Sequence, residues 1–115
     1  MNTKLKFIAE QEIVIWRSPS DQQHVTLRLS EPQIEKGRDG HDAWACYPKL
    51  DGLIHLEKPV LESTSFRALV VALQICRQLI RKESKGAKIF FTSKFHGDRL
   101  LPDDGLSLKE LFETA

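Results

Sequence analysis

The longest regular pattern in the chain lies at residues 63–85, STSFRALVVALQICRQLIRKESK. Its apolar residues recur every three or four positions, which is typical of a helix with one buried face. Ser63, Thr64 or Ser65 can cap its start, basic residues gather near its end, and Gly86 is expected in the C′ position. A helix of this length must cover its apolar face, so the rest of the chain has to supply a matching apolar surface.

A helical projection of this segment predicts which residues face the core. The core face is expected to hold Phe66, Leu69, Ala72, Leu73, Cys76, Leu79 and Ile80. The solvent face is expected to hold Arg67, Gln74, Gln78, Arg81 and Lys85, with Val70 and Val71 at its shoulders. The apolar face is therefore broad enough to pack across a sheet.

Strand patterns precede the helix. Residues 4–17 are rich in β-branched and aromatic residues and are expected to form a long strand with a bulge near Glu10 and Gln11. Residues 24–30 alternate polar and apolar, which indicates an antiparallel strand with one face in water. Residues 31–42 carry proline and two glycines among charges and are expected to be an exposed loop.

The segment DAWACYP, residues 42–48, is followed by the pair Asp51 and Gly52. An Asp-Gly pair between two apolar runs predicts a two-residue hairpin loop, because such turns need positive φ angles. Leu50 would then face Leu53, and counting back places Cys46 opposite Glu57. Pro48 can instead place a bulge here, since it lacks an amide hydrogen.

The expected hairpin places Trp44, Cys46, His55 and Glu57 on one face of the sheet. A cysteine, a histidine and an acid together could supply a nucleophile, a base and an orienting group. However, free cysteines are commonly buried, and no helix N-terminus is expected near Cys46 to lower its pKa. We therefore expect packing from Cys46, and no catalytic residue is assigned.

Five residues are candidates for binding. Trp44, His55 and Glu57 belong to the hairpin face, and Arg38 and His41 to the loop before it. The histidines lack HxH or HExxH spacing, the two cysteines lack CxxC spacing, and no glycine-rich phosphate motif is present. The sequence thus predicts no metal and no cofactor.

Composition limits the partners. Lys plus Arg total 17 and Asp plus Glu total 16, a net charge of +1, so there is no strong signal for nucleic acid or an anionic membrane. The base-rich side of the helix is better explained as a solvated face. Glu10 and Glu12 interrupt any signal-peptide core, and no apolar run reaches the ~20 residues of a membrane span. We expect a cytoplasmic protein that is a monomer or a homodimer.

The C-terminal part predicts a short strand at residues 88–92 and, from the capping-box pattern at 107–110, a short helix ending near Phe112. The predicted fold is a single α+β domain over residues 1–115. An antiparallel meander of about four strands packs on one long helix at residues 65–83.

These features resemble a family of small bacterial proteins known only as a domain of unknown function. The resemblance rests on Trp44 and Cys46, on Gly52-Leu53 and on the segment SFRALVVAL at residues 65–73, and it covers roughly residues 7–82. It implies the fold and gives no activity. The chain departs from that pattern at Pro48 and in its tail from about residue 86.

Two classes of function are compatible with the sequence. The first is a non-catalytic binding or protein-interaction module, of which an immunity-type inhibitor of a bacterial toxin is one version. The second is a small-molecule binder or enzyme that uses Trp44, Cys46, His55 and Glu57. A toxin gene or a metabolic operon beside the gene would favour the first or the second class, respectively.

Overall fold

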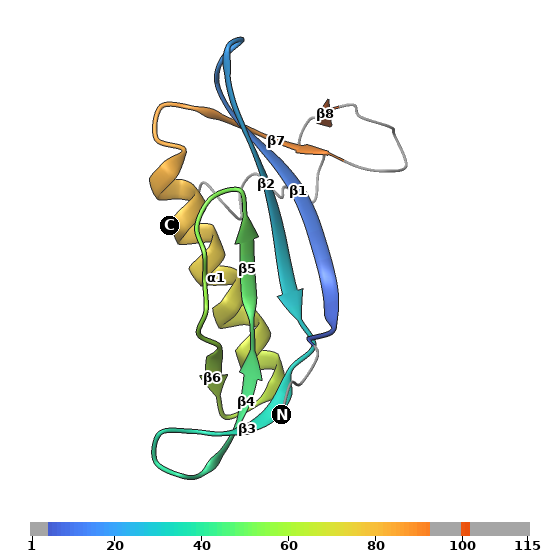
Figure 1. Ribbon diagram of the computed structural model, residues 1–115, viewed down its shortest axis with the longest axis vertical. Coiled ribbons are helices and arrows are strands. Elements are labelled where there is room, and N and C mark those ends of the chain that lie inside the picture. Colours follow the sequence, from blue (N-terminus) through green and yellow to red (C-terminus); the bar gives the residue numbers. More distant parts are fainter. Residues whose placement is uncertain (1–4, 93–99, 102–115) are drawn as a thin grey trace.

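The protein has an α+β fold, in which one long helix packs against two antiparallel sheets (Figure 1). The computed structural model describes residues 5–92 and 100–101, and residues 1–4, 93–99 and 102–115 lie outside the described part. One sheet has the strand order β5-β2-β1-β7-β8 and the other β3-β4-β6. In chain order the elements are β1 (Phe7–Ser18), β2 (Asp21–Ser30), β3 (Gln33–Lys36), β4 (Asp42–Cys46), β5 (Pro48–Asp51), β6 (Val60–Glu62), α1 (Ser65–Glu83), β7 (Lys88–Thr92) and β8 (Leu100–Leu101).

The β1–β2 hairpin forms the centre of the larger sheet. Ile13 pairs with Val25 and both are buried under α1, as the alternating pattern of β2 predicts. The predicted bulge near residues 10 and 11 is wrong, because both residues pair regularly with β2. The register shifts instead between Phe7 and Ala9, near the exposed Ile8, where an irregular strand costs no core contact.

The opposite face of this sheet carries a second, smaller apolar cluster. Val14 is buried there beside its cross-strand partner Phe90, and the ring of Phe90 meets that of Trp16 edge to face with centroids 6.3 Å apart. Such an arrangement is favourable for aromatic pairs. It joins β7 to β1 independently of the helix.

The expectation of a loop at residues 31–42 is wrong at residues 33–36. Residues Gln33–Lys36 form β3 and pair with β4, so that Ile34 lies beside Trp44. Residues 31–32 and 37–41 stay outside strands, and in the turn between β3 and β4 the Gly37 N–H donates to the His41 carbonyl over 2.7 Å. A four-residue strand with two charged residues is too short to stand out from a loop by its pattern.

The predicted hairpin register after DAWACYP is also wrong. Cys46 pairs with Val60 of β6, and Glu57 is not its partner. Residues 48–51 leave this small sheet and pair with β2 of the larger one, with Leu50 opposite Leu27. The expected meander is therefore divided between two sheets.

The division occurs at Tyr47, whose main chain is held by the end of β2. The Ser30 N–H donates to the Tyr47 carbonyl over 3.2 Å, and the Tyr47 N–H donates to the buried Ser30 hydroxyl over 2.7 Å. Pro48 follows at once and has no amide hydrogen to continue the β4 pairing. The turn at Gly52 has the expected positive φ of 93°, and the Leu50 carbonyl accepts from the Leu53 N–H over 3.1 Å and from the Ile54 N–H over 3.2 Å. The bridge partner of Leu50 is Ile54, one residue beyond the expected Leu53.

The helix occupies the predicted residues, Ser65–Glu83. Thr64 is its N-cap, and the Thr64 hydroxyl accepts a hydrogen bond from the Arg67 N–H over 3.1 Å. The expectation that Gly86 is the C′ residue is wrong, because Ser84 is the C-cap and Gly86 lies one position beyond C′. Its φ of 76° still turns the chain towards β7.

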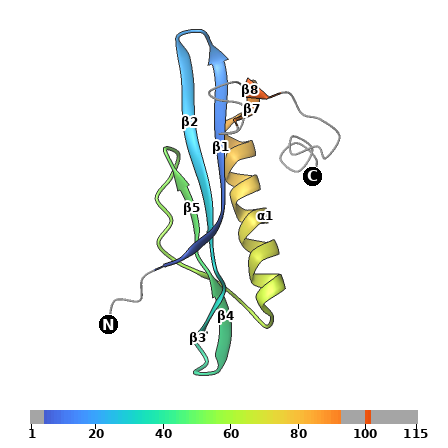
Figure 2. The same cartoon turned by 90° about the vertical axis from the view of Figure 1, so that its right-hand side faces the viewer.

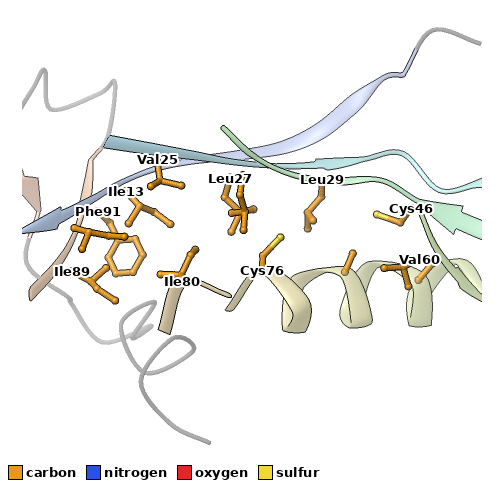
Figure 3. Close-up of a cluster of buried hydrophobic side chains, with 14 residues drawn as sticks. Ile13, Val25, Leu27, Leu29, Cys46, Val60, Cys76, Ile80, Ile89 and Phe91 are labelled. Atoms are coloured by element: carbon orange, nitrogen blue, oxygen red, sulfur yellow. The ribbon is translucent and has the colours of Figure 1, made fainter. Parts of the chain in front are cut away.

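The buried stripe of α1 consists largely of small side chains. Ala68, Ala72, Cys76 and Ile80 are fully buried at four-residue spacing. The sheets and the helix enclose a continuous row of core side chains, from Ile89 and Phe91 at one end to Cys46 and Val60 at the other (Figure 3). Alanine brings a helix backbone close to its neighbours, so one helix can contact β2, β4, β5 and β6.

Residues flanking this stripe meet the expectations only in part. Leu69 and Leu73 pack against the core, as predicted together with Cys76, but both remain partly exposed. Phe66 was expected on the core face and is instead 73% exposed. It precedes Ala68 by two residues, roughly 200° around the helix, so the narrow stripe excludes it.

The C-terminal strand expected at residues 88–92 is confirmed as β7, which pairs with β1. The C-terminal helix expected at residues 107–112 lies outside the described residues. Figure 2 shows α1 on one side of the larger sheet. In the described ranges, no helix has the length and apolarity needed to cross a bilayer.

The close approach of α1 predicts that Ala72→Leu destabilises the protein. The larger side chain has to displace packed neighbours, which costs about 1–3 kcal/mol of unfolding free energy. Gln78→Leu, on the exposed face of the same helix, is the control and should stay within about 0.5 kcal/mol of the unsubstituted protein. Urea denaturation measures both variants, and equal stability of the two would contradict the close packing.

Candidate functional site

Trp44 and Cys46 lie on the side of β4 that faces the helix. Cys46 is fully buried in the core, and Trp44 packs against the same core while remaining partly exposed. The Cys46 Sγ–H donates to the Ser30 carbonyl over 3.3 Å. The thiol is therefore part of the joint between the two sheets.

His55 and Glu57 lie in the segment that leads from β5 to β6. The His55 Nε2 atom is 3.3 Å from a Glu57 carboxylate oxygen, and both side chains are 78% exposed. They form a solvated pair, for which a small contribution to stability is typical. The predicted face that joins them to Trp44 and Cys46 depended on the wrong register. The structure thus brings His55 to Glu57 but brings neither to the Cys46 thiol.

Burial controls the chemistry of both cysteines. It raises the pKa of the Cys46 thiol, and it raises the pKa of Cys76 from 9 to about 12, with a smaller contribution from Cys46 nearby. Since the thiolate is the reactive form, both side chains stay protonated and unreactive at neutral pH. This chemistry suits packing and does not suit nucleophilic attack.

Arg38 and His41 lie in the turn between β3 and β4, at the lower end of the molecule in Figure 1, away from the segment after β5. The Asp39 carboxylate accepts a hydrogen bond from the His41 N–H over 2.9 Å and lies 3.2 Å from His41 Nδ1. The backbone hydrogen bond from His41, followed by the side-chain one, lowers the pKa of Asp39. Asp39 and His41 thus shape this turn, and both are exposed.

An open pocket of about 530 Å³ lies beside His55 and Glu57. It is bounded by the end of the segment before β6, by the start of β5 and by the helix. Its walls are largely apolar, and two charged residues and a histidine line it. The lining residues are Pro48, His55, Leu56, Glu57, Lys58, Pro59, Val60 and Ile75.

Several large apolar side chains of the described residues are exposed, among them Phe7, Ile8 and Ile54, and three others lie near the start of α1. We call Ile34, Phe66 and Val70 the end surface; their exposed fractions are 59%, 73% and 36%. Phe66 and Val70 are one turn apart on α1, and β3 lies at the same end of the molecule (Figures 1 and 2). Phe66 was expected in the core. Ile34 lies in the segment expected to be an exposed loop and Val70 at the shoulder of the polar stripe, so the sequence indicates exposure for these two.

Residues 5–92 contain no group of three or more His, Cys, Asp or Glu side chains placed to hold a metal ion.

Buried, protonated cysteines predict slow reaction with thiol reagents. Native protein at neutral pH should react very little with a thiol reagent. Unfolded protein should react at both free thiols of each chain, because unfolding exposes them. Peptide mapping after labelling identifies the residue. Fast labelling of native Cys46 would contradict the buried geometry.

Comparison of the chain with protein-family models, with curated proteins and with solved structures finds no match. The resemblance to a family of unknown function stays a prediction.

Proposed function

We propose that this protein is a non-catalytic protein-interaction module and that the end surface contacts its partner. The observation that carries this proposal is the exposure of Phe66. Its side chain is 73% exposed, the highest value among the large hydrophobic residues in the described part of the chain. Val70 lies one turn away on the same helix, and Ile34 is on β3 at the same end of the molecule. Exposed apolar groups that cluster in this way are typical of interaction sites.

The surroundings of the end surface also favour a protein partner. Trp44 lies directly beside Ile34 in the sheet and adds partly exposed aromatic surface. Glu62, on the other side of Trp44, is held by Arg67 through a 3.0 Å hydrogen bond, so the charges of this neighbouring pair are balanced. An apolar centre beside such a pair fits an apolar segment of another protein better than a nucleic acid.

Neither cysteine is available as a nucleophile, and this supports a non-catalytic role. Cys46 is enclosed and bonded to a backbone carbonyl, and Cys76 is fully buried. An immunity-type inhibitor of a toxin is one version of this function, and a second copy of the chain is an alternative partner. The former predicts tight binding to the product of a neighbouring toxin gene.

Site-specific photo-crosslinking in the source cells tests the proposal. A photoreactive amino acid at position 66 should give a discrete cross-linked product, because that side chain lies in the interface. The same amino acid at position 78, on the solvent face of α1, is the control and should give none. With the cross-linked partner purified, Phe66→Ser with Val70→Ser should weaken binding about tenfold or more, as loss of central contacts does.

Two results would contradict the proposal. One is equal cross-linking from positions 66 and 78, and the other is full affinity of the Phe66→Ser, Val70→Ser variant with retained thermal stability.

A further inference from the structure

The pocket between α1 and the segment before β6 does not belong to the end surface, and it has the properties of a small-molecule site. Its volume of about 530 Å³ falls in the range of roughly 300–1,000 Å³ that is typical of ligand pockets. Val60 at its base is 8% exposed and contributes to the core, so this wall is fixed by the fold. Two prolines, Pro48 and Pro59, restrict the backbone on either side.

The segment that forms the outer wall is tied to the sheet. Lys49, on β5, donates from Nζ to the Leu56 carbonyl over 2.8 Å. This bond holds the wall next to β5 although the segment makes no strand pairing between Ile54 and Val60. The ammonium of Lys49 has a neutral carbonyl as this partner, so its positive charge is not cancelled there.

The charges that line the pocket are unequal. Glu57 contributes one carboxylate, which lies 3.3 Å from His55 Nε2. Lys58 makes no ion pair or hydrogen bond with the part of the chain that the structure describes. An anion that enters the pocket therefore meets one unpaired ammonium at the lining and a second, that of Lys49, behind the Leu56 carbonyl.

We propose that this pocket binds a small amphiphilic carboxylate, whose apolar tail contacts Leu56, Val60 and Ile75 while its carboxylate pairs with Lys58. The two ammoniums, Lys58 at the lining and Lys49 beside it, outnumber the single lining carboxylate of Glu57, so the site is matched by one further carboxylate. A phosphate group would call for more donors than the lining supplies. The inference does not depend on the proposed function, since the pocket shares no residue with the end surface.

Octanoate is a suitable probe, and 1-octanol is its neutral counterpart with the same chain length. Titration of the full chain, followed by methyl NMR signals, should give saturable shifts at Leu56, Val60 and Ile75 with octanoate. Octanol should bind more weakly. Lys58→Gln should weaken octanoate binding about two- to fivefold, as loss of a partly solvated ion pair does, without changing octanol binding.

Lys82→Gln is the matched control, because Lys82 is exposed on α1 and does not line the pocket. It should leave octanoate binding unchanged. The proposal is overturned if octanoate produces no saturable shifts at the pocket, if Lys58→Gln binds it as well as the unsubstituted protein, or if Lys82→Gln weakens it equally. Lys58 is exposed, so these variants are expected to fold, and their melting temperatures verify this.

Discussion

Packing of the small-residue stripe of α1 against both sheets is the interaction on which the other features depend. The three-stranded sheet has strands of four, five and three residues, too short to be stable alone. Ala68 and Ala72 let the helix backbone approach closely, and the helix contacts β4 and β6 as well as β2 and β5. One helix thus supplies the apolar cover for two sheets, and it also supplies Ile75 to the wall of the pocket.

The joint at Ser30 and Tyr47 complements this packing. At this joint the chain passes from one sheet to the other, so that residues 42–46 form β4 in the smaller sheet and residues 48–51 form β5 in the larger one. The same joint encloses the Cys46 thiol, whose sulfur donates to the Ser30 carbonyl. A residue type that often signals chemistry is therefore used here to connect two sheets, and the exposed surfaces available for function lie elsewhere, at the end surface and at the pocket.

Residues 65–83 and the β2 strand could be predicted from the sequence because their periodicity is long and local. The strand pairing after Cys46 could not be predicted in this way. Asp51-Gly52 does make the expected turn, but which strands pair depends on Ser30 and on buried core residues that are distant in the sequence. The candidate site had the same limits. His55 and Glu57 do lie together, although in a segment without the predicted strand. Their placement beside Trp44 and Cys46 required a register that only tertiary contacts determine. Phe66 was missed because a helical projection cannot show how narrow the contact with a sheet is.

Native-state hydrogen exchange tests most directly whether α1 holds the two sheets as one unit. If α1 holds them together, the slowest amides of α1 near Cys76, of β2 near Leu27 and of β4 near Ala45 should share one opening free energy, equal to that of global unfolding. Exchange of the central α1 amides, or of β4, through an opening several kcal/mol lower than that of β2 would show separate units and contradict the account.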